Sequence, residues 1–194
     1  MPDTANARRL LTQAAFAADG VARLPLARAI VWARLRHQMG VLHRIGRRDS
    51  GADTEASCNT IRGLSEDAAH GTGTDEHLGL EGAASIAYFE ALSRLVPENV
   101  SFQGRSRRPP KDLVNAAFSD AYAILLSECT DALIAAGLEP SLGVPHASTD
   151  KRPSLSLHLM EEFRPLPVDG YEATMQWHLK GALPGYEWSG AAWR

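Results

Sequence analysis

The residues of this sequence that could do chemistry together are Glu81, His146 and Glu161, two carboxylates and an imidazole. Glu81 belongs to a segment whose apolar residues follow helical spacing. Those residues are Leu80, Ala84, Ala87, Tyr88, Ala91, Leu92 and Leu95. At about 100° per residue, Glu81 falls inside this apolar face. Burying a carboxylate is costly unless a cation or a hydrogen-bond donor meets it. His146 and Glu161 follow beside proline and glycine residues, so the three together predict a divalent-metal site.

Two carboxylates and an imidazole suit Mg²⁺ or Mn²⁺, because both ions prefer oxygen ligands and Mn²⁺ accepts nitrogen more readily. Such a site can activate water or a DNA 3′ hydroxyl and stabilise a pentacoordinate phosphate. His158 shares a helix face with Glu161. Each residue also has an ordinary explanation: a helix N-terminal carboxylate for Glu81, an exposed loop histidine for His146, and surface charge for Glu161. Residues 71–74 (GTGT) lack the lysine of a phosphate-binding loop.

The charges of the chain are segregated, although the formal net charge is only −3. Residues 20–48 contain seven arginines and no acid, residues 49–80 contain seven acids and one base, and residues 99–111 are purely basic. The arginines of the first segment are Arg23, Arg28, Arg34, Arg36, Arg44, Arg47 and Arg48. Basic clusters are the usual electrostatic footprint of a phosphate-backbone partner, and a solvated helix face is the alternative explanation.

The apolar pattern predicts an all-α fold. We expect helices over 5–18, 23–45, 112–137 and 154–163, and a helix that carries Glu81 and ends at Pro97. Residues 49–78 read as a loop with one helical turn near 65–67, and 138–153 as a second loop. We predict a helical domain over 1–165 and an irregular tail over 166–194, where the periodicity ends.

Composition restricts the class of protein. The chain is 44% hydrophobic, as expected of a globular protein, and charged residues interrupt every apolar run that could span a membrane. The N-terminus does not have the order of a signal peptide, and two cysteines are too few for a disulfide framework. These features predict a cytoplasmic protein without a membrane partner.

Several motifs resemble one family, the CRISPR-associated adaptation integrase. Residues 79–84 (GLEGAA) and 87–89 (AYF) resemble its metal-binding helix. Phe102, residues 105–110 (RSRRPP) and 112–116 (DLVNA) resemble its next stretch. Residues 137–143 (GLEPSLG) with His146 resemble its histidine loop, and 152–155 (RPSL) with 159–165 (LMEEFRP) resemble its third metal segment. The resemblance covers roughly residues 10–166.

The resemblance implies a C-terminal helical domain in which Glu81, His146 and Glu161 bind Mn²⁺ or Mg²⁺. It implies a homodimer that joins a small ferredoxin-like CRISPR-associated protein and inserts foreign DNA segments into the CRISPR repeat array. We assign Arg105, Arg107 and Arg108 to DNA phosphates. We expect Asn115, Tyr122 and His158 to support the site, with helix packing as the alternative role of Asn115 and Tyr122.

The sequence also departs from this family. We expect no N-terminal β-domain in this chain. Arg34 and His37 replace the usual Lys and Asn, Asp120 and Ala121 replace an aromatic-Gly pair, and His158 stands where an Asp is usual. These departures support a rival hypothesis, a truncated and inactive remnant that acts only in DNA binding or complex assembly. A helical domain with incidental charge is the third hypothesis.

Overall fold

The computed structural model of the chain describes residues 4–47, 54–71, 74–95, 102, 104–106, 109–143 and 153–169. Within these residues the chain forms helices and no strand, which confirms the all-α prediction. The elements are α1 (Thr4–Ala18), α2 (Gly20–Gly46), α3 (Glu55–His70), α4 (Thr74–Leu95), α5 (Leu113–Ala135), α6 (Ser154–Phe163) and the π-helical turn η1 (Pro165–Asp169).

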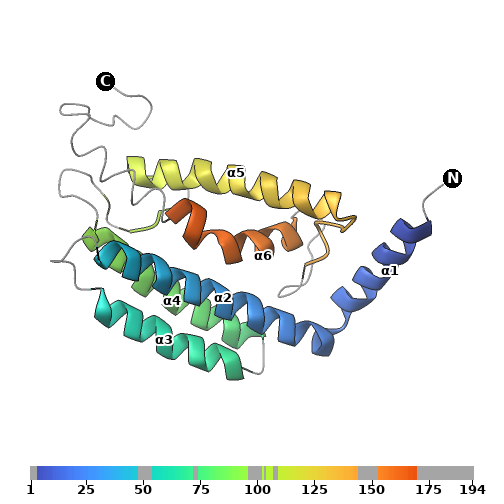
Figure 1. Cartoon of the computed structure of the whole chain (residues 1–194), viewed down its shortest axis with the longest axis horizontal. Coiled ribbons are helices and arrows are strands. Elements are labelled where there is room, and N and C mark those ends of the chain that lie inside the picture. The colour runs from blue at the N-terminus through green and yellow to red at the C-terminus, as the bar shows by residue number, and fades with distance from the viewer. Residues whose placement is uncertain are drawn as a thin grey trace.

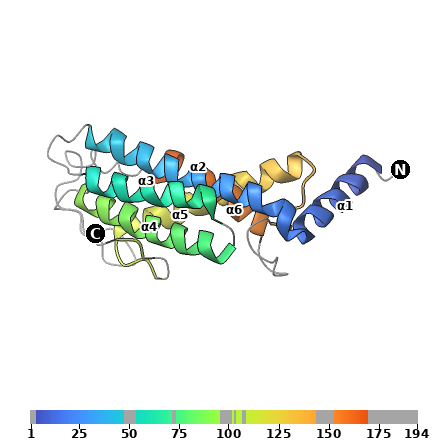
Figure 2. The same ribbon diagram turned by 90° about the horizontal axis from the view of Figure 1, so that it is seen from below.

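The helices are elongated and mostly side by side (Figure 1). Helices α2, α3 and α4 pack against one another as a three-helix group, and the view from below shows them as neighbouring rows (Figure 2). The short helix α6 lies between α2 and α5 and contacts both (Figure 1). Helix α1 extends from the N-terminal end of α2. This arrangement places α6 against the centre of α2.

Side-chain caps explain where two of the long helices begin. The carboxylate of Asp19 accepts hydrogen bonds from Val21 N at 2.9 Å and Ala22 N at 3.1 Å, which starts α2. Asp112 Oδ1 accepts from Asn115 N at 2.7 Å, which starts α5. After α5, Gly137 has a φ of 70°, the left-handed conformation that favours glycine just beyond a helix. The predicted start and end of this helix are confirmed within a residue or two.

The core joins helices α2 to α6 around their apolar faces, and none of the described residues buried in it comes from α1. Leu35 and Leu42 of α2, Ile61 of α3, and Tyr88 of α4 are fully buried. Aromatic side chains connect α4 to α5, because the ring centroids of Phe89 and Phe118 lie 6.1 Å apart in an edge-to-face arrangement. This packing fixes α4, which carries Glu81, relative to α2 and α5.

Two sequence expectations require correction. Residues 49–78 were expected to be mostly loop, but 55–70 form α3 and α4 begins at Thr74. Residues 65–67, expected to form a single turn, lie inside α3, where Ser65 is buried. The face that α3 buries is made mainly of small side chains, so it lacks the large apolar residues that mark a helix in sequence. These residues are Ser57, Cys58, Ile61, Ser65 and Ala68.

The helical body continues slightly past Pro165. The turn η1 packs on α2, α5 and α6, and its residues Val168 and Asp169 are buried. Residues 170–194, most of the predicted irregular tail, lie outside the described residues. Within the described part of the chain, no helix is both long enough and apolar enough to cross a membrane.

Candidate active site

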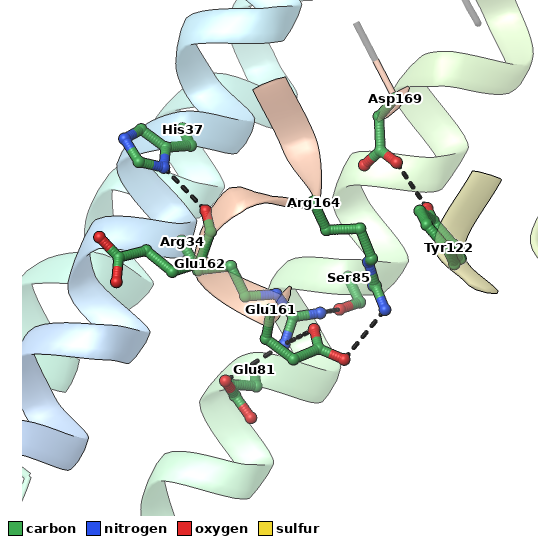
Figure 3. Close-up of polar contacts among 9 residues, drawn as sticks. All are labelled: Arg34, His37, Glu81, Ser85, Tyr122, Glu161, Glu162, Arg164 and Asp169. Carbon is green, nitrogen blue, oxygen red and sulfur yellow. Dashed lines mark hydrogen bonds and ion pairs between the residues drawn. The ribbon is translucent and has the colours of Figure 1, made fainter. Parts of the chain in front are cut away.

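Two of the three predicted metal ligands, Glu81 and Glu161, meet in space around one cation. Glu81 comes from α4 and Glu161 from α6, and Arg34 of α2 lies between them (Figure 3). Arg34 Nη1 is 3.1 Å from Glu81 Oε1 and 2.9 Å from Glu161 Oε2. A cation therefore meets the Glu81 carboxylate, as its position on a mostly apolar helix face requires.

Arg34 is held in place from several sides. Its Nη2 donates to Ser85 Oγ at 3.1 Å, and the residue is 5% exposed. One turn later on α2, His37 Nδ1 lies 2.9 Å from the backbone oxygen of Glu162. Because a carbonyl oxygen only accepts, His37 Nδ1 must carry the proton in this contact. Arg34 and His37 thus fasten α6 to α2 beside the carboxylates.

Glu161 is also paired with a second buried guanidinium. Arg164 Nη1 donates to Glu161 Oε1 at 3.0 Å, and the Arg164 guanidinium lies 4.6 Å from the centroid of the Tyr122 ring. Burial alone would lower the pKa of Arg164, but Glu161 and other nearby acidic groups raise it, so Arg164 stays charged. Two carboxylates and two guanidiniums therefore balance in this cluster.

The donor set is chemically suited to a divalent ion. Glu161 Oε2 is buried and accepts no hydrogen bond from the described residues, although it is ion-paired with Arg34. Two oxygen donors from different helices converge on the Arg34 nitrogen, and carboxylate oxygens are ligands that Mg²⁺ prefers. The described residues contain no group of three or more His, Cys, Asp or Glu side chains that could hold a metal. The predicted third ligand, His146, lies outside the described residues.

A buried network continues from Arg164 into the protein. The Tyr122 hydroxyl donates to Asp169 Oδ1 at 2.5 Å. Burial raises the pKa of Asp169 above its ordinary value, even though Arg164 opposes that shift. Burial likewise raises the pKa of Tyr122 well above its usual range, so its hydroxyl stays a neutral donor. The predicted supporting residue Tyr122 therefore lies next to the carboxylate cluster and stacks against Arg164.

Asn115 ties the basic loop to the start of α5. It is fully buried, and its Nδ2 donates to Asp112 Oδ2 at 2.7 Å and to Gly104 O at 3.0 Å. Its Oδ1 accepts from Ser106 N at 2.7 Å and from Arg105 Nη1 at 3.0 Å. Asn115 thereby positions Arg105, one of the three arginines predicted to bind DNA.

Arg105 is one of the residues that line a pocket. With Arg164 and Ser85 it helps to line a pocket of about 330 Å³, completed by Ile86, Phe89, Glu90 and Gly104. Its guanidinium also lies 5.2 Å from the centroid of the Tyr122 ring. The other two predicted DNA-binding arginines, Arg107 and Arg108, lie outside the described residues.

His158 is buried beneath the segment that leads toward His146. A Cβ on Gly143 would come within 2.9 Å of His158 Cε1, so glycine permits this close approach. Residues 144–152, which carry His146, lie outside the described residues.

Sequence reasoning missed Arg34, Arg164, Asp169 and Ser85 as members of the cluster. A signal for Arg34 was present, because it follows Val31 by three residues on the apolar face of α2. Asp169 gave no signal, since the periodic pattern ends before it.

Comparison with known proteins identifies the family. The family model described as CRISPR associated protein Cas1 matches residues 1–175. The chain belongs to the Cas1 family. It is 43% identical over 158 residues to the CRISPR-associated endonuclease Cas1 1 of Thermus thermophilus, an alignment covering 81% of this chain and 46% of that protein. It is 36% identical over 185 residues to the CRISPR-associated endonuclease Cas1 of Methanopyrus kandleri, covering 94% of this chain and 55% of the relative.

A solved Cas1-containing assembly has the same fold. The structure titled "Partial Cas6-RT-Cas1–Cas2 complex" matches with a TM-score of 0.84 and 26% identity, covering 94% of this chain and 55% of that one. The chain thus spans about half the length of the curated Cas1 relatives it matches.

Proposed function

We propose that this Cas1 chain carries the metal-dependent active site of a DNA endonuclease and integrase. The observation that carries the proposal is the convergence of Glu81 and Glu161, from α4 and α6, on one cation position. Relatives of this chain are named as Cas1 endonucleases, which supports phosphoryl transfer on DNA. In this proposal Glu81, Glu161 and His146 hold Mn²⁺ or Mg²⁺.

The ion, when bound, would supply Lewis-acid stabilisation of the phosphate and lower the pKa of an attacking hydroxyl. The protein residues position the ligands of the ion and supply the charges around it. Glu161 is held by Arg164, which is in turn stacked on Tyr122, so the ligand has little freedom to turn away. Arg105 lines the adjacent pocket and would present its guanidinium group to a DNA phosphate. Asn115 keeps Arg105 in that position.

The substrates and partners are proposed on the same basis. Foreign DNA segments and the CRISPR repeat would be the DNA substrates, and Arg107 and Arg108 would add phosphate contacts beside Arg105. A solved assembly that shares this fold contains Cas2 by its title, and this supports a small CRISPR-associated protein partner. A homodimer remains part of the proposal.

A second candidate function is DNA binding or assembly without cleavage. It is favoured by the arginines, since Arg34 and Arg164 neutralise both carboxylates, and by His158 in place of an expected Asp. This candidate predicts salt-dependent DNA binding without any effect of Mn²⁺.

Cleavage of a branched DNA by the purified chain separates the two candidates. The endonuclease proposal predicts cleavage with Mn²⁺ that is lost with EDTA and with Glu81→Ala. Glu66→Ala is the matched control, because Glu66 is an exposed helical carboxylate on α3. Activity that persists in Glu81→Ala would refute the metal assignment. A folded chain that binds DNA and never cuts it would favour the second candidate.

A further inference from the structure

We propose that Arg34 competes with the divalent ion for Glu81 and Glu161 and so sets the metal affinity of the site. This inference rests on the proposed function, because it concerns the same two carboxylates. The Arg34 guanidinium occupies the place between them and acts as an internal cation (Figure 3).

The contact geometry argues for competition. One nitrogen, Arg34 Nη1, contacts both carboxylates, at 3.1 Å to Glu81 Oε1 and 2.9 Å to Glu161 Oε2. A metal that bridged the two residues would use oxygens that now face this nitrogen. If Arg34 stayed in place, a dication would also sit beside two guanidiniums, those of Arg34 and Arg164, with only two carboxylates to offset them. The ion and Nη1 therefore cannot share this position.

A metal bound between the two carboxylates requires a new position for the Arg34 guanidinium. Arg34 Nη2 donates to Ser85 Oγ at 3.1 Å, and Ser85 lines the pocket of about 330 Å³ next to Arg105 and Arg164. A side-chain rotation that keeps the Ser85 contact would turn the guanidinium from the carboxylates toward this pocket. In the proposed metal-bound state, Ser85 and the pocket, whose lining includes the acidic Glu90, would receive the guanidinium, since an unpaired charge in an apolar core would be costly.

If Arg34 only supported the site, the position of α6 would depend on it, whereas competition requires that α6 stays in place without Arg34. Glu161 retains Arg164 as a partner at 3.0 Å when Arg34 leaves, and His37 still holds the Glu162 carbonyl at 2.9 Å. The ligand helix is therefore fixed by contacts other than Arg34. Removing the Arg34 charge should free the carboxylates for metal without releasing α6.

This inference is tested by titrating the intact chain with Mn²⁺. Binding is measured by calorimetry and by the electron paramagnetic resonance of free Mn²⁺. We expect Arg34→Gln to bind Mn²⁺ about tenfold tighter than the wild type, equivalent to about 1.4 kcal/mol. Arg34→Lys, which keeps the charge on a more flexible side chain, should fall between them. Arg36→Gln is the matched control, because Arg36 is exposed on the same helix and its loss removes the same charge. Glu161→Gln, which removes the charge of a proposed ligand, should bind Mn²⁺ more weakly than the wild type.

The outcomes distinguish the two proposals. Equal Mn²⁺ affinity of the wild type and Arg34→Gln would refute competition and leave the metal site standing. Weaker binding by Arg34→Gln would overturn the inference, because Arg34 would then be a residue that positions the ligands. Absence of Mn²⁺ binding in every variant would refute the proposed function itself.

A measurement on the wild type covers the case in which Arg34→Gln does not fold. The side-chain ¹⁵N signals of the arginines can be followed by NMR during Mg²⁺ addition, with Arg34→Lys used to assign the Arg34 signal. We expect the Arg34 signal to shift as the site fills. Saturation of the site with no change at Arg34 would contradict the inference.

Discussion

The ion pairs of Glu81 and Glu161 lead to a prediction about the metal-free protein that has a definite sign. Each residue is replaced by its isosteric amide, Glu81→Gln or Glu161→Gln. Glu161 contacts two buried guanidiniums, at 2.9 and 3.0 Å, whereas Glu81 contacts one at 3.1 Å. Both substitutions should destabilise the protein, and Glu161→Gln should destabilise it more.

The expected magnitudes follow from these contacts. A hydrogen bond to a charged group contributes about 1.5–3 kcal/mol, and removing one partner of a buried pair costs about 3–5 kcal/mol. The side chains of Glu81 and Glu161 are 22% and 23% exposed, so water reduces the loss. Each glutamine also keeps one accepting oxygen. We therefore expect a loss of about 2–4 kcal/mol for Glu161→Gln and about 1–2 kcal/mol for Glu81→Gln.

Urea unfolding in EDTA, followed by circular dichroism, measures these free energies. Glu162→Gln is the matched control: it makes the same change on the same helix, and its carboxylate points away from the cluster in Figure 3. Its unfolding free energy should stay near that of the wild type. An increase in stability on either Glu81→Gln or Glu161→Gln would refute the reasoning, because two carboxylates without an intervening cation would repel each other and gain from losing one charge.

Two further predictions concern the residues behind the cluster. Asn115→Ala should lower the unfolding free energy by about 2–4 kcal/mol, because it strips buried partners from Ser106 N, Asp112 and Arg105. Asn115→Ala should also weaken DNA binding. An unfolding free energy in urea equal to that of the wild type would contradict the role of Asn115 in this hydrogen-bond network. Burial raises the pKa of Asp169, so the folded protein holds this proton more tightly than the unfolded chain does. The stability it contributes is present below the ordinary pKa and is lost as pH rises through the folded-state pKa. The unfolding free energy of the wild type minus that of Asp169→Asn should therefore increase as the pH falls from neutral toward 4, and the opposite slope would rule this out.

Helical periodicity in the sequence was sufficient to predict most of the helices. The helices over 113–135 and 154–163 were predicted nearly to their ends, because an aspartate cap, a left-handed glycine and a flanking proline mark them. Helix α3 was missed because four of its five buried residues are Ser, Cys or Ala, while its acids resemble a solvated loop. Large apolar residues mark a helix in sequence, whereas a close-packed face of small residues does not.

The candidate site could be predicted only in part, for a different physical reason. Glu81 and Glu161 were identified from their residue types and motifs, and the structure brings them together. The spacing from Val31 places Arg34 on the apolar face of α2, but the sequence does not show that α4 and α6 bring their carboxylates to that face. Arg34 was therefore counted with the basic segment. The role of His146 stays a prediction.

The central claim is that Glu81, Glu161 and His146 hold a divalent metal. It is tested most directly by crystals of the intact chain grown with Mn²⁺ and measured near the manganese absorption edge. We predict an anomalous peak coordinated by Glu81, Glu161 and His146, with Arg34 Nη1 displaced from at least one carboxylate. A chain that cuts DNA with Mn²⁺ but shows no peak there, with Arg34 still bridging Glu81 and Glu161, would contradict the account.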